Sequence, residues 1–218
     1  MGFLDEFFKK YKKNNSATVT VDEDYKLPAF ADVDLGLHWS RITVDNLAEN
    51  EKYFDEISTW ASDKNIQEYI SYSVPVDKLF RSYVVDSDSD KAFSDKCNLY
   101  FCFNDDKDLV GATYISAPIG YNKNSTIEYI VVNPKFQGSG IGTKMIKSIS
   151  SFGDYFNNGY ESEGFMASVN TANVASSRAL IKNNYKVVST NWTDLGKHYT
   201  VLYLSNRDMV SQGRDAAN

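Results

Sequence analysis

The stretch that decides the fold reads TIEYIVVNPKFQGSGIGTKMIKSISSF, residues 126–152. Its apolar beginning predicts a strand over 126–132, and 133–136 predict a loop that leads into the glycine-rich run 137–142. Apolar side chains then recur at helical spacing, at Ile141, Met145, Ile149 and Phe152. The stretch therefore predicts a strand, a glycine-rich turn and a helix in direct succession.

The glycine-rich turn has the properties of a phosphate-binding loop. Gly138, Gly140 and Gly142 let the backbone approach a ligand closely and turn its amides outward. The helix that follows adds unpaired N–H groups and the positive end of its dipole, and both stabilise a pyrophosphate. Neither the dinucleotide fingerprint nor the P-loop fits, because the glycines alternate and Thr143 precedes Lys144 in the reverse of the P-loop order.

Two motifs resemble a known family. The pattern Q-x-x-G-x-G at 137–142, after a hydrophobic strand and Val-Asn-Pro, resembles the acetyl-coenzyme A loop of the GNAT superfamily of N-acetyltransferases. The pattern N-x-x-S-x-R-x-L at 173–180 resembles the branch that contains ribosomal-protein and spermidine N-acetyltransferases. The competing interpretation of the first motif is a glycine-rich connection without a ligand.

The resemblance implies an α/β (α+β) fold, a mixed twisted sheet of about six to seven strands flanked by helices and splayed after the fourth strand. The residue patterns predict strands over 35–44, 98–103, 109–116, 126–132, 164–169, 185–190 and 198–205. They predict helices from Asp45, over 63–72 and 76–85, from residue 141 and over 173–183. Gly111 is expected to mark a close backbone approach, and Asn184 a left-handed helix end.

Length and composition suit one domain with an appendage, since the chain has 218 residues of which 42% are apolar. We expect an N-terminal extension at 1–34, a GNAT domain at 35–206 and a polar tail at 207–218. The extension contains a predicted amphipathic helix over 3–13, which packs on the domain or, alternatively, attaches to a membrane surface. No apolar run reaches the length of a membrane span, and a cytoplasmic location is expected.

Charge and metal-ligand spacing limit the partners. A net charge of −6 argues against nucleic acid and favours a cationic substrate. His38 and His198 lack a neighbouring Cys or His at ligand spacing, so no metal is predicted. Cys97 and Cys102 are expected to point to opposite faces of one strand, which would prevent a disulfide.

The resemblance implies acetyl-coenzyme A as co-substrate and names its contacts. The strand residues Ile130, Val131 and Val132 would face the pantetheine arm, and the pyrophosphate would lie among Gln137, Gly138, Ser139, Gly140, Ile141, Gly142 and Thr143. Asn173 would reach the pantetheine amide, with a helix cap as its alternative role. Ser176 would either assist in this contact or face the helix groove.

Acetyl transfer to an amine also needs a base, because an ammonium with a pKa near 10.4 is protonated at neutral pH. Glu128 is the candidate, since a carboxylate on this strand often has that role in the family and alternation would place it on the face of Ile130 and Val132. A solvent-facing or salt-bridged carboxylate is the alternative, and Tyr129 and Tyr114 are further candidates.

The resemblance also exposes one missing group. Many family members carry a tyrosine that protonates the departing thiolate, and Leu180 occupies the matching position, so the general acid is unassigned.

The leading hypothesis is a cytoplasmic N-acetyltransferase that moves acetyl from acetyl-coenzyme A to a primary amine by direct attack in a ternary complex. The acceptor is a small molecule or a peptide: a protein N-terminus, a lysine, a polyamine or an aminoglycoside. The segments expected to bind it, 45–90 and 118–124, carry no motif that chooses among these. The alternatives are a coenzyme A-binding module without transferase activity and a protein for a different phosphate ligand.

Overall fold

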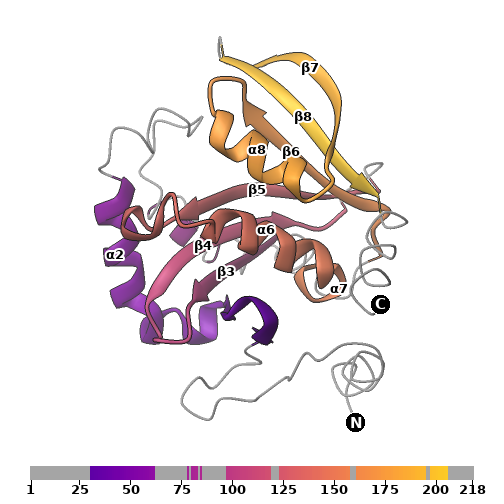
Figure 1. The fold of residues 1–218 in the computed structure, drawn as a ribbon. Helices are drawn as coiled ribbons and strands as arrows, with labels where there is room; N and C mark the ends of the chain where they lie inside the picture. The colour runs from indigo at the N-terminus through magenta and orange to yellow at the C-terminus, as the bar shows by residue number, and fades with distance from the viewer. Residues whose placement is uncertain are drawn as a thin grey trace.

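The structure is a computed structural model that describes residues 30–61, 78, 80–82, 84, 97–118, 123–157, 161–194 and 197–205. In this part of the chain one mixed sheet of eight strands has the order β1-β2-β3-β4-β5-β6-β8-β7 (Figure 1). The strands are β1 (Phe30–Asp32), β2 (Leu37–Ile42), β3 (Cys97–Phe103), β4 (Leu109–Ser116), β5 (Ser125–Val132), β6 (Gly164–Asn170), β7 (Lys186–Asp194) and β8 (Lys197–Ser205).

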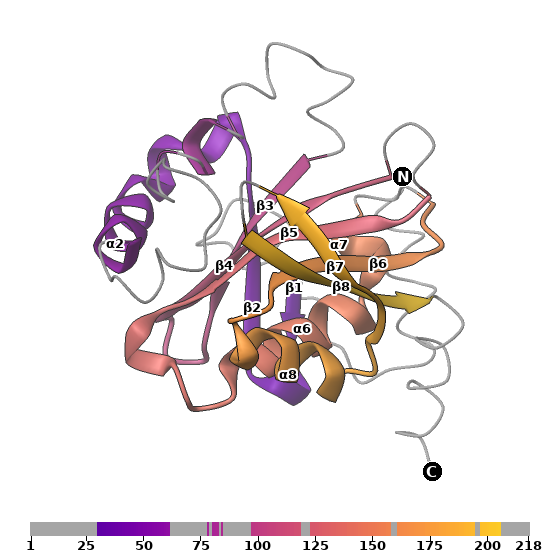
Figure 2. The ribbon, with the colours of Figure 1, turned by 90° about the horizontal axis from the view of Figure 1, so that it is seen from above.

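Helices cover both faces of this sheet (Figure 2). The α-helices are α2 (Glu51–Ala61), α6 (Ile141–Ser151), α7 (Gly153–Phe156) and α8 (Val174–Lys182). Short 3-10 turns are η1 (Val33–Leu35), η2 (Val44–Asn46), η3 (Ala48–Asn50) and η4 (Pro134–Phe136). No helix in the described ranges is long and apolar enough to cross a membrane.

Two apolar cores result, one on each face of the sheet. The α6-side core joins Met145 and Ile149 of α6 to strand residues such as Tyr100. The α2-side core joins Phe54 of α2 to strand residues such as Phe101. Successive side chains of β3 therefore enter different cores, as the alternation of a strand that is buried on both faces requires.

The sheet opens in the middle of β5. Strand β5 pairs in parallel with β6 only from Ser125 to Ile127, whereas its antiparallel pairing with β4 continues to Val132. Figure 1 shows β5 and β6 diverging beyond the paired segment. This geometry confirms the predicted splay after the strand that precedes the glycine loop.

A β-bulge lies at the point of divergence. Ile115 pairs with Ile127, but Tyr114 pairs with Tyr129, so Glu128 is an extra residue on β5 with no partner opposite. Because a bulge bends its strand and increases the local twist, it turns the rest of β5 away from β6.

The bulge also reverses which face the side chains of β5 enter. Ile127 lies in the α6-side core, but two residues later Tyr129 packs against the α2-side core, and Ile130 and Val132 pack against the α6-side core. The prediction that Glu128 shares a face with Ile130 and Val132 is wrong, because simple alternation does not survive the extra residue. Glu128 follows Ile127 on the opposite, α2-side face.

Most of the remaining element predictions are confirmed. The β3–β4 hairpin with its turn at 104–108, the helix after the glycine loop, α8 and the last three strands all form close to their predicted positions. The predicted left-handed helix end is present, since Asn184 has φ 65°. The N–H groups of Asn184 and Tyr185 donate to the carbonyls of Ile181 and Leu180, which is a Schellman motif.

Two differences concern the N-terminal half, and the first of them also changes the strand count. Strand β1 occupies residues expected to be irregular and pairs with β2, so the sheet has eight strands instead of six or seven. The helix expected from Asp45 begins at Glu51, because two 3-10 turns precede it. Positions 78, 80–82 and 84 of the predicted helix 76–85 are helical. The predictions for 3–13, 63–72 and 207–218 lie outside the described residues.

Candidate active site

The glycine loop has an open, left-handed backbone. Gly138 and Gly140 have φ of 77° and 88°, a region that residues with side chains rarely adopt. Apart from each glycine and its two chain neighbours, nothing in the described structure lies within 4 Å of where a Cβ would stand on either. Gly140 is the N-cap of α6. The first N–H groups of α6, beginning at Ile141, have no partner within the helix, so they are available to an anion.

Side chains of the loop brace the loop itself. The Nε2 of Gln137 donates to the carbonyl of Val132 at 3.1 Å, and the hydroxyl of Ser139 donates to the carbonyl of Phe136. A Cβ on Gly142 would stand 3.3 Å from Cγ2 of Val132, which is a tight contact. The loop therefore offers a ligand its backbone more than these side chains.

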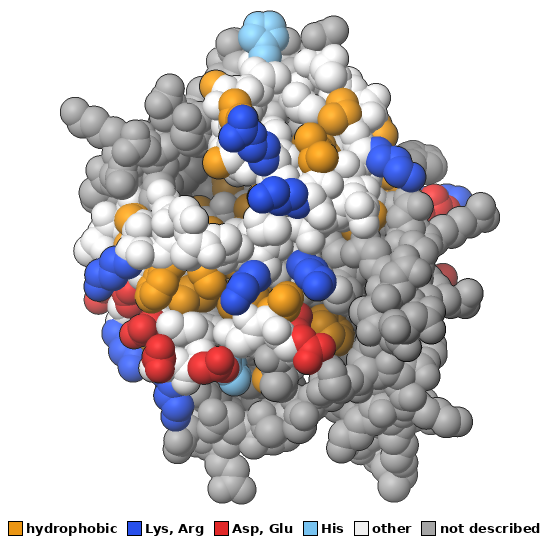
Figure 3. All heavy atoms as spheres, viewed as in Figure 1, with side chains coloured by type: hydrophobic (Ala, Val, Ile, Leu, Met, Phe, Trp, Pro, Cys, Tyr) orange, Lys and Arg blue, Asp and Glu red, His pale blue; other side chains and the backbone are white. Residues whose placement is uncertain are grey.

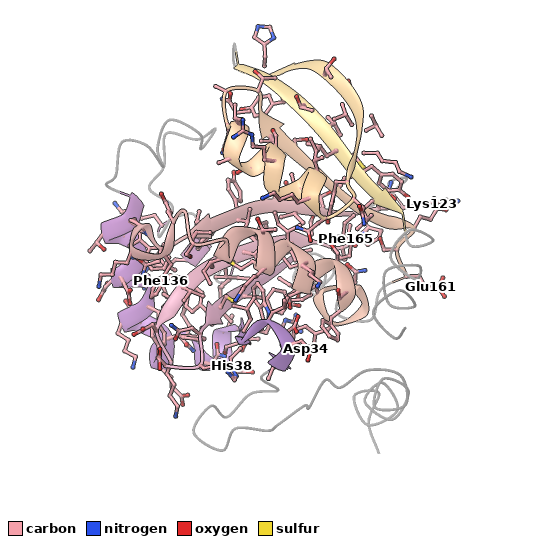
Figure 4. All side chains as sticks on the ribbon, in the orientation of Figure 1. Asp34, His38, Lys123, Phe136, Glu161 and Phe165 are labelled. Carbon is pink, nitrogen blue, oxygen red and sulfur yellow. The ribbon has the colours of Figure 1, made fainter. Side chains whose placement is uncertain are left out.

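The second half of β5 supplies an open backbone edge. Ile130, Val131 and Val132 pair with β4 on one side, and none of them pairs with β6 on the other. Figure 4 shows Phe136, which follows this segment, on one side of the molecule, and Lys123 and Glu161 on the opposite side, near the paired ends of β5 and β6. The open edge thus runs from the closed end of the β5–β6 pair toward the glycine loop.

Gly111 confirms the predicted close approach of backbone beneath this edge. A Cβ there would stand 2.6 Å from the carbonyl oxygen of Val131 and 2.7 Å from the sulfur of Met145. Only glycine lets α6 lie this close to the sheet, and α6 carries the glycine loop at its start.

Glu128 lies at the bulge with one identified partner. The hydroxyl of Ser116 donates to Oε1 of Glu128 at 2.7 Å. The residue as a whole is exposed, but protein surrounds enough of the carboxyl group for desolvation to raise its pKa, and the Ser116 hydrogen bond opposes this rise. The proton resides on the carboxyl group, so the surroundings of that group decide its pKa, not the exposure of the residue as a whole.

The two tyrosines considered with Glu128 lie beside it on the α2 side. Tyr129 is half-buried and meets Phe80 edge to face, with ring centroids 6.2 Å apart. Tyr114 is buried and stands opposite Tyr129 in the β4–β5 ladder. The bulge therefore puts Tyr129 on the face covered by α2, where Glu128 and Tyr114 also lie.

The second motif forms a helix cap. Oδ1 of Asn173 accepts from the backbone N–H of Ser176 at 3.1 Å, so the two predicted contacts belong to the first turn of α8. This cap uses the oxygen of Asn173 and leaves its Nδ2 to donate elsewhere. Leu180 is buried in the α6-side core, so its position supplies neither a proton nor a polar contact.

Three residues of the site, Ser116, Asn133 and Asn183, were not predicted from the sequence. Ser116 is an ordinary strand serine until the bulge places it beside Glu128. Nδ2 of Asn183 donates to the carbonyl of Thr143 at 3.0 Å and joins the end of α8 to the first turn of α6. Asn133 is buried before the glycine loop. Only Asn133 had a hint in the sequence, its place in Val-Asn-Pro.

Basic side chains gather on the face that carries α6 and α8 (Figure 3). The exposed basic residues of these helices are Lys144, Lys147, Arg178 and Lys182. This face attracts anions although the net charge of the chain is −6.

His38 lies on the surface, whereas Cys102 is buried. Nε2 of His38 lies 2.9 Å from a carboxylate oxygen of Asp105 on the surface. Cys102 is buried and free, and burial raises the pKa of its thiol. Within the described ranges no three His, Cys, Asp or Glu side chains are placed to hold a metal ion.

A sheet that opens beside a left-handed glycine loop, just ahead of a helix N-terminus, is an arrangement suited to an anionic ligand. The model of the acetyltransferase (GNAT) family matches residues 54–179, which is more than half of the chain. The chain belongs to this family, and it is an acyltransferase by that membership. The recognised resemblance is thereby confirmed.

Solved structures agree on the fold. Spermidine N-acetyltransferase from Vibrio cholerae, in complex with CoA and spermine, has a TM-score of 0.58 at 11% identity over 80% of this chain and 98% of its own. Ribosomal-protein-S5-alanine acetyltransferase from Vibrio fischeri has a TM-score of 0.60 at 9% identity over 83% and 98%.

A ribosomal L7/L12 α-N-protein acetyltransferase with coenzyme A has a TM-score of 0.56 at 14% identity over 79% of this chain and 96% of its own. At these identities the likeness shows the fold alone. No curated protein matches the sequence.

Proposed function

We propose that the protein transfers the acetyl group of acetyl-coenzyme A to a primary amine, by direct attack within a ternary complex. One observation carries the proposal: Glu128, a carboxyl group with a raised pKa, stands at the bulge where the sheet opens. The open edge of β5 connects this carboxyl group to the glycine loop, so a base and a coenzyme site would lie along the same strand.

The coenzyme would bind along the open edge of β5. Its phosphates suit the loop from Gln137 to Thr143, where backbone N–H groups and the start of α6 favour negative charge. Its pantetheine arm suits the open edge at Ile130–Val132, and Nδ2 of Asn173 suits an amide oxygen of that arm. The exposed Lys and Arg of α6 and α8 add attraction for the phosphates.

Glu128 would take one proton from the acceptor ammonium, directly or through a water molecule. The neutral nitrogen then forms a bond to the thioester carbonyl carbon, and the carbon–sulfur bond breaks. A carboxylate whose pKa is raised toward neutral is the stronger base for this transfer. Leu180 offers no proton, so the thiolate would take its proton from the acceptor nitrogen or from solvent.

The acceptor would be a cationic amine. A chain with 29 acidic and 23 basic side chains attracts such a substrate. Two of the structural neighbours act, by their names, on spermidine and on a ribosomal protein, and both substrates carry amines. A polyamine and a protein N-terminus are thus the first acceptors to test.

A coenzyme A-binding module without transferase activity is the second candidate, and the burial of Leu180 in place of a tyrosine favours it. The test measures thiol release from acetyl-coenzyme A with spermidine, an N-terminal alanine peptide, a lysine peptide and an aminoglycoside. Release that depends on one of these amines is expected. Coenzyme binding without turnover on any amine would favour the module, and stabilisation by nucleotides instead of coenzyme A would overturn both candidates.

A further inference from the structure

Asn133 joins the end of β5 to the glycine loop, and only 2% of it is exposed. Its backbone N–H donates to the carbonyl of Val110 at 2.9 Å and extends the β4–β5 ladder. Its Nδ2 donates to the carbonyl of Leu109 at 2.9 Å and to Oε1 of Glu56 at 3.1 Å. Its Oδ1 accepts from the N–H of Lys135 at 3.1 Å. The side-chain amide therefore has a partner for its oxygen and two partners for its nitrogen.

Hydrogen bonds continue from Asn133 into the loop. The carbonyl of Asn133 accepts from the N–H of Phe136 at 2.8 Å. The carbonyl of Phe136 in turn accepts from the N–H of Ser139 at 3.4 Å, one residue before Gly140. The orientation of Asn133 thereby sets the course of the chain up to the start of α6.

Glu56 reaches Asn133 from a separate layer. It is half-buried on α2, a helix fixed to the sheet by Phe54 and Ile57, which are 0% and 1% exposed. The other partners of the Asn133 side chain, Leu109 and Lys135, belong to β4 and to the loop. A hydrogen bond to a carboxylate is stronger than one between neutral groups, so the contact from α2 holds the amide firmly.

We propose that Glu56 is a positioning residue for the glycine loop, acting through Asn133. The inference rests on the proposed function, because it takes this loop as the coenzyme site. The helix that carries Glu56 covers the same face of the sheet as Tyr129 and the bulge at Glu128. The bond between Glu56 and Asn133 therefore connects the layer over the proposed base to the loop that holds the coenzyme phosphates.

Three variants and one control test the role. Glu56→Ala removes the acceptor, and Glu56→Gln keeps an oxygen at the same distance along the side chain. Glu56→Asp keeps the charge, but its shorter side chain places the carboxylate farther from Asn133. Asp55→Ala removes the same charge from the neighbouring residue of α2, an exposed side chain 3.5 Å from Arg81. Calorimetric titration with coenzyme A, at a temperature where circular dichroism shows each variant folded, measures the dissociation constant.

Glu56→Ala should raise the dissociation constant about tenfold, and Glu56→Asp should raise it in the same direction. Glu56→Gln keeps a neutral acceptor, so it should raise the dissociation constant less than Glu56→Ala does. Asp55→Ala should stay within about twofold of wild type. A purely structural role would lower the unfolding temperature of Glu56→Ala but leave the affinity of the folded protein unchanged. That result would overturn this inference alone. Failure of the wild type to bind coenzyme A would overturn the proposed function and this inference together.

Discussion

The hydroxyl of Ser116 donates a 2.7 Å hydrogen bond to Glu128 across the β4–β5 pair, at the residue where β5 has one position more than β4. The bulge places Tyr129 on the same α2-side face as Glu128, and the Ser116 hydroxyl holds the carboxyl group of Glu128 there. The position of the proposed base therefore depends on backbone register as much as on the side chain itself.

Glu128→Gln should bind coenzyme A with wild-type affinity while kcat falls about 10²- to 10⁴-fold, the range for loss of a general base. The loss should shrink above about pH 9, because more of the acceptor amine is then already neutral. Steady-state kinetics from pH 6 to 10 measure both effects. A loss that is equal at every pH would instead assign Glu128 to holding the acceptor in place.

Ser116→Ala should move the acidic limb of the pH–rate profile to higher pH. Glu128 must be ionised to accept a proton, so activity rises as pH passes its pKa, and the Ser116 hydrogen bond lowers that pKa. Without the hydroxyl the pKa rises further. Ser168→Ala, which removes an exposed hydroxyl from β6, is the matched control and should leave the limb in place. A limb that does not move in Ser116→Ala would separate this pKa from catalysis.

Gly140→Asp should abolish stabilisation by coenzyme A, which for a native-state ligand at a hundredfold excess over Kd is about 2.7 kcal/mol. The substitution combines a negative charge with a strained backbone, since Gly140 has φ 88°. Gly140→Ala carries the backbone strain alone, roughly 1–2 kcal/mol, and isolates the charge effect. Thermal unfolding with and without coenzyme measures the shift. Undiminished stabilisation of Gly140→Asp would remove the loop from the coenzyme site.

Glu128 should also make the folded protein less stable at neutral than at acidic pH. Its folded-state pKa lies above the reference value of 4.5, so the native state binds more protons than the unfolded state between these two values. The free energy of unfolding therefore falls as pH rises through that window. In urea titrations, the free energy of unfolding of Glu128→Gln should fall less between pH 4 and pH 7 than that of the wild type. Burial also raises the pKa of Asp32, so the free energy of unfolding should still decrease with pH in both the wild type and Glu128→Gln.

Sequence patterns predicted the elements whose signals are local. The glycine loop, the β3–β4 hairpin and the left-handed Asn184 each follow from a few adjacent residues with defined backbone preferences. The bulge does not, because its strand contains neither glycine nor proline, and the apolar run Tyr129–Val132 fits either face of a sheet that is buried on both sides. The Glu56–Asn133 contact joins residues 77 positions apart, so only the packing of α2 on the sheet brings them together.

Strand β1 also could not be predicted from its own residues. Its three residues are too few for a periodic pattern, and pairing with β2 decides their conformation. The bonds that hold β5 and β6 together at the closed end also come from separate segments, since Glu163 donates its N–H to the carbonyl of Lys123 and their side chains form a 3.3 Å ion pair.

The opening of the sheet depends on a single residue, because Glu128 gives β5 one position more than β4. If Glu128 were deleted, Ile127 would be followed directly by Tyr129, and Tyr129, Ile130, Val131 and Val132 would each keep the core that they now contact. The straightened strand could then remain beside β6 along its whole length. The apolar pattern of β5 is compatible with such a closed sheet. Deletion of this one residue would therefore remove the open edge that the coenzyme is proposed to occupy.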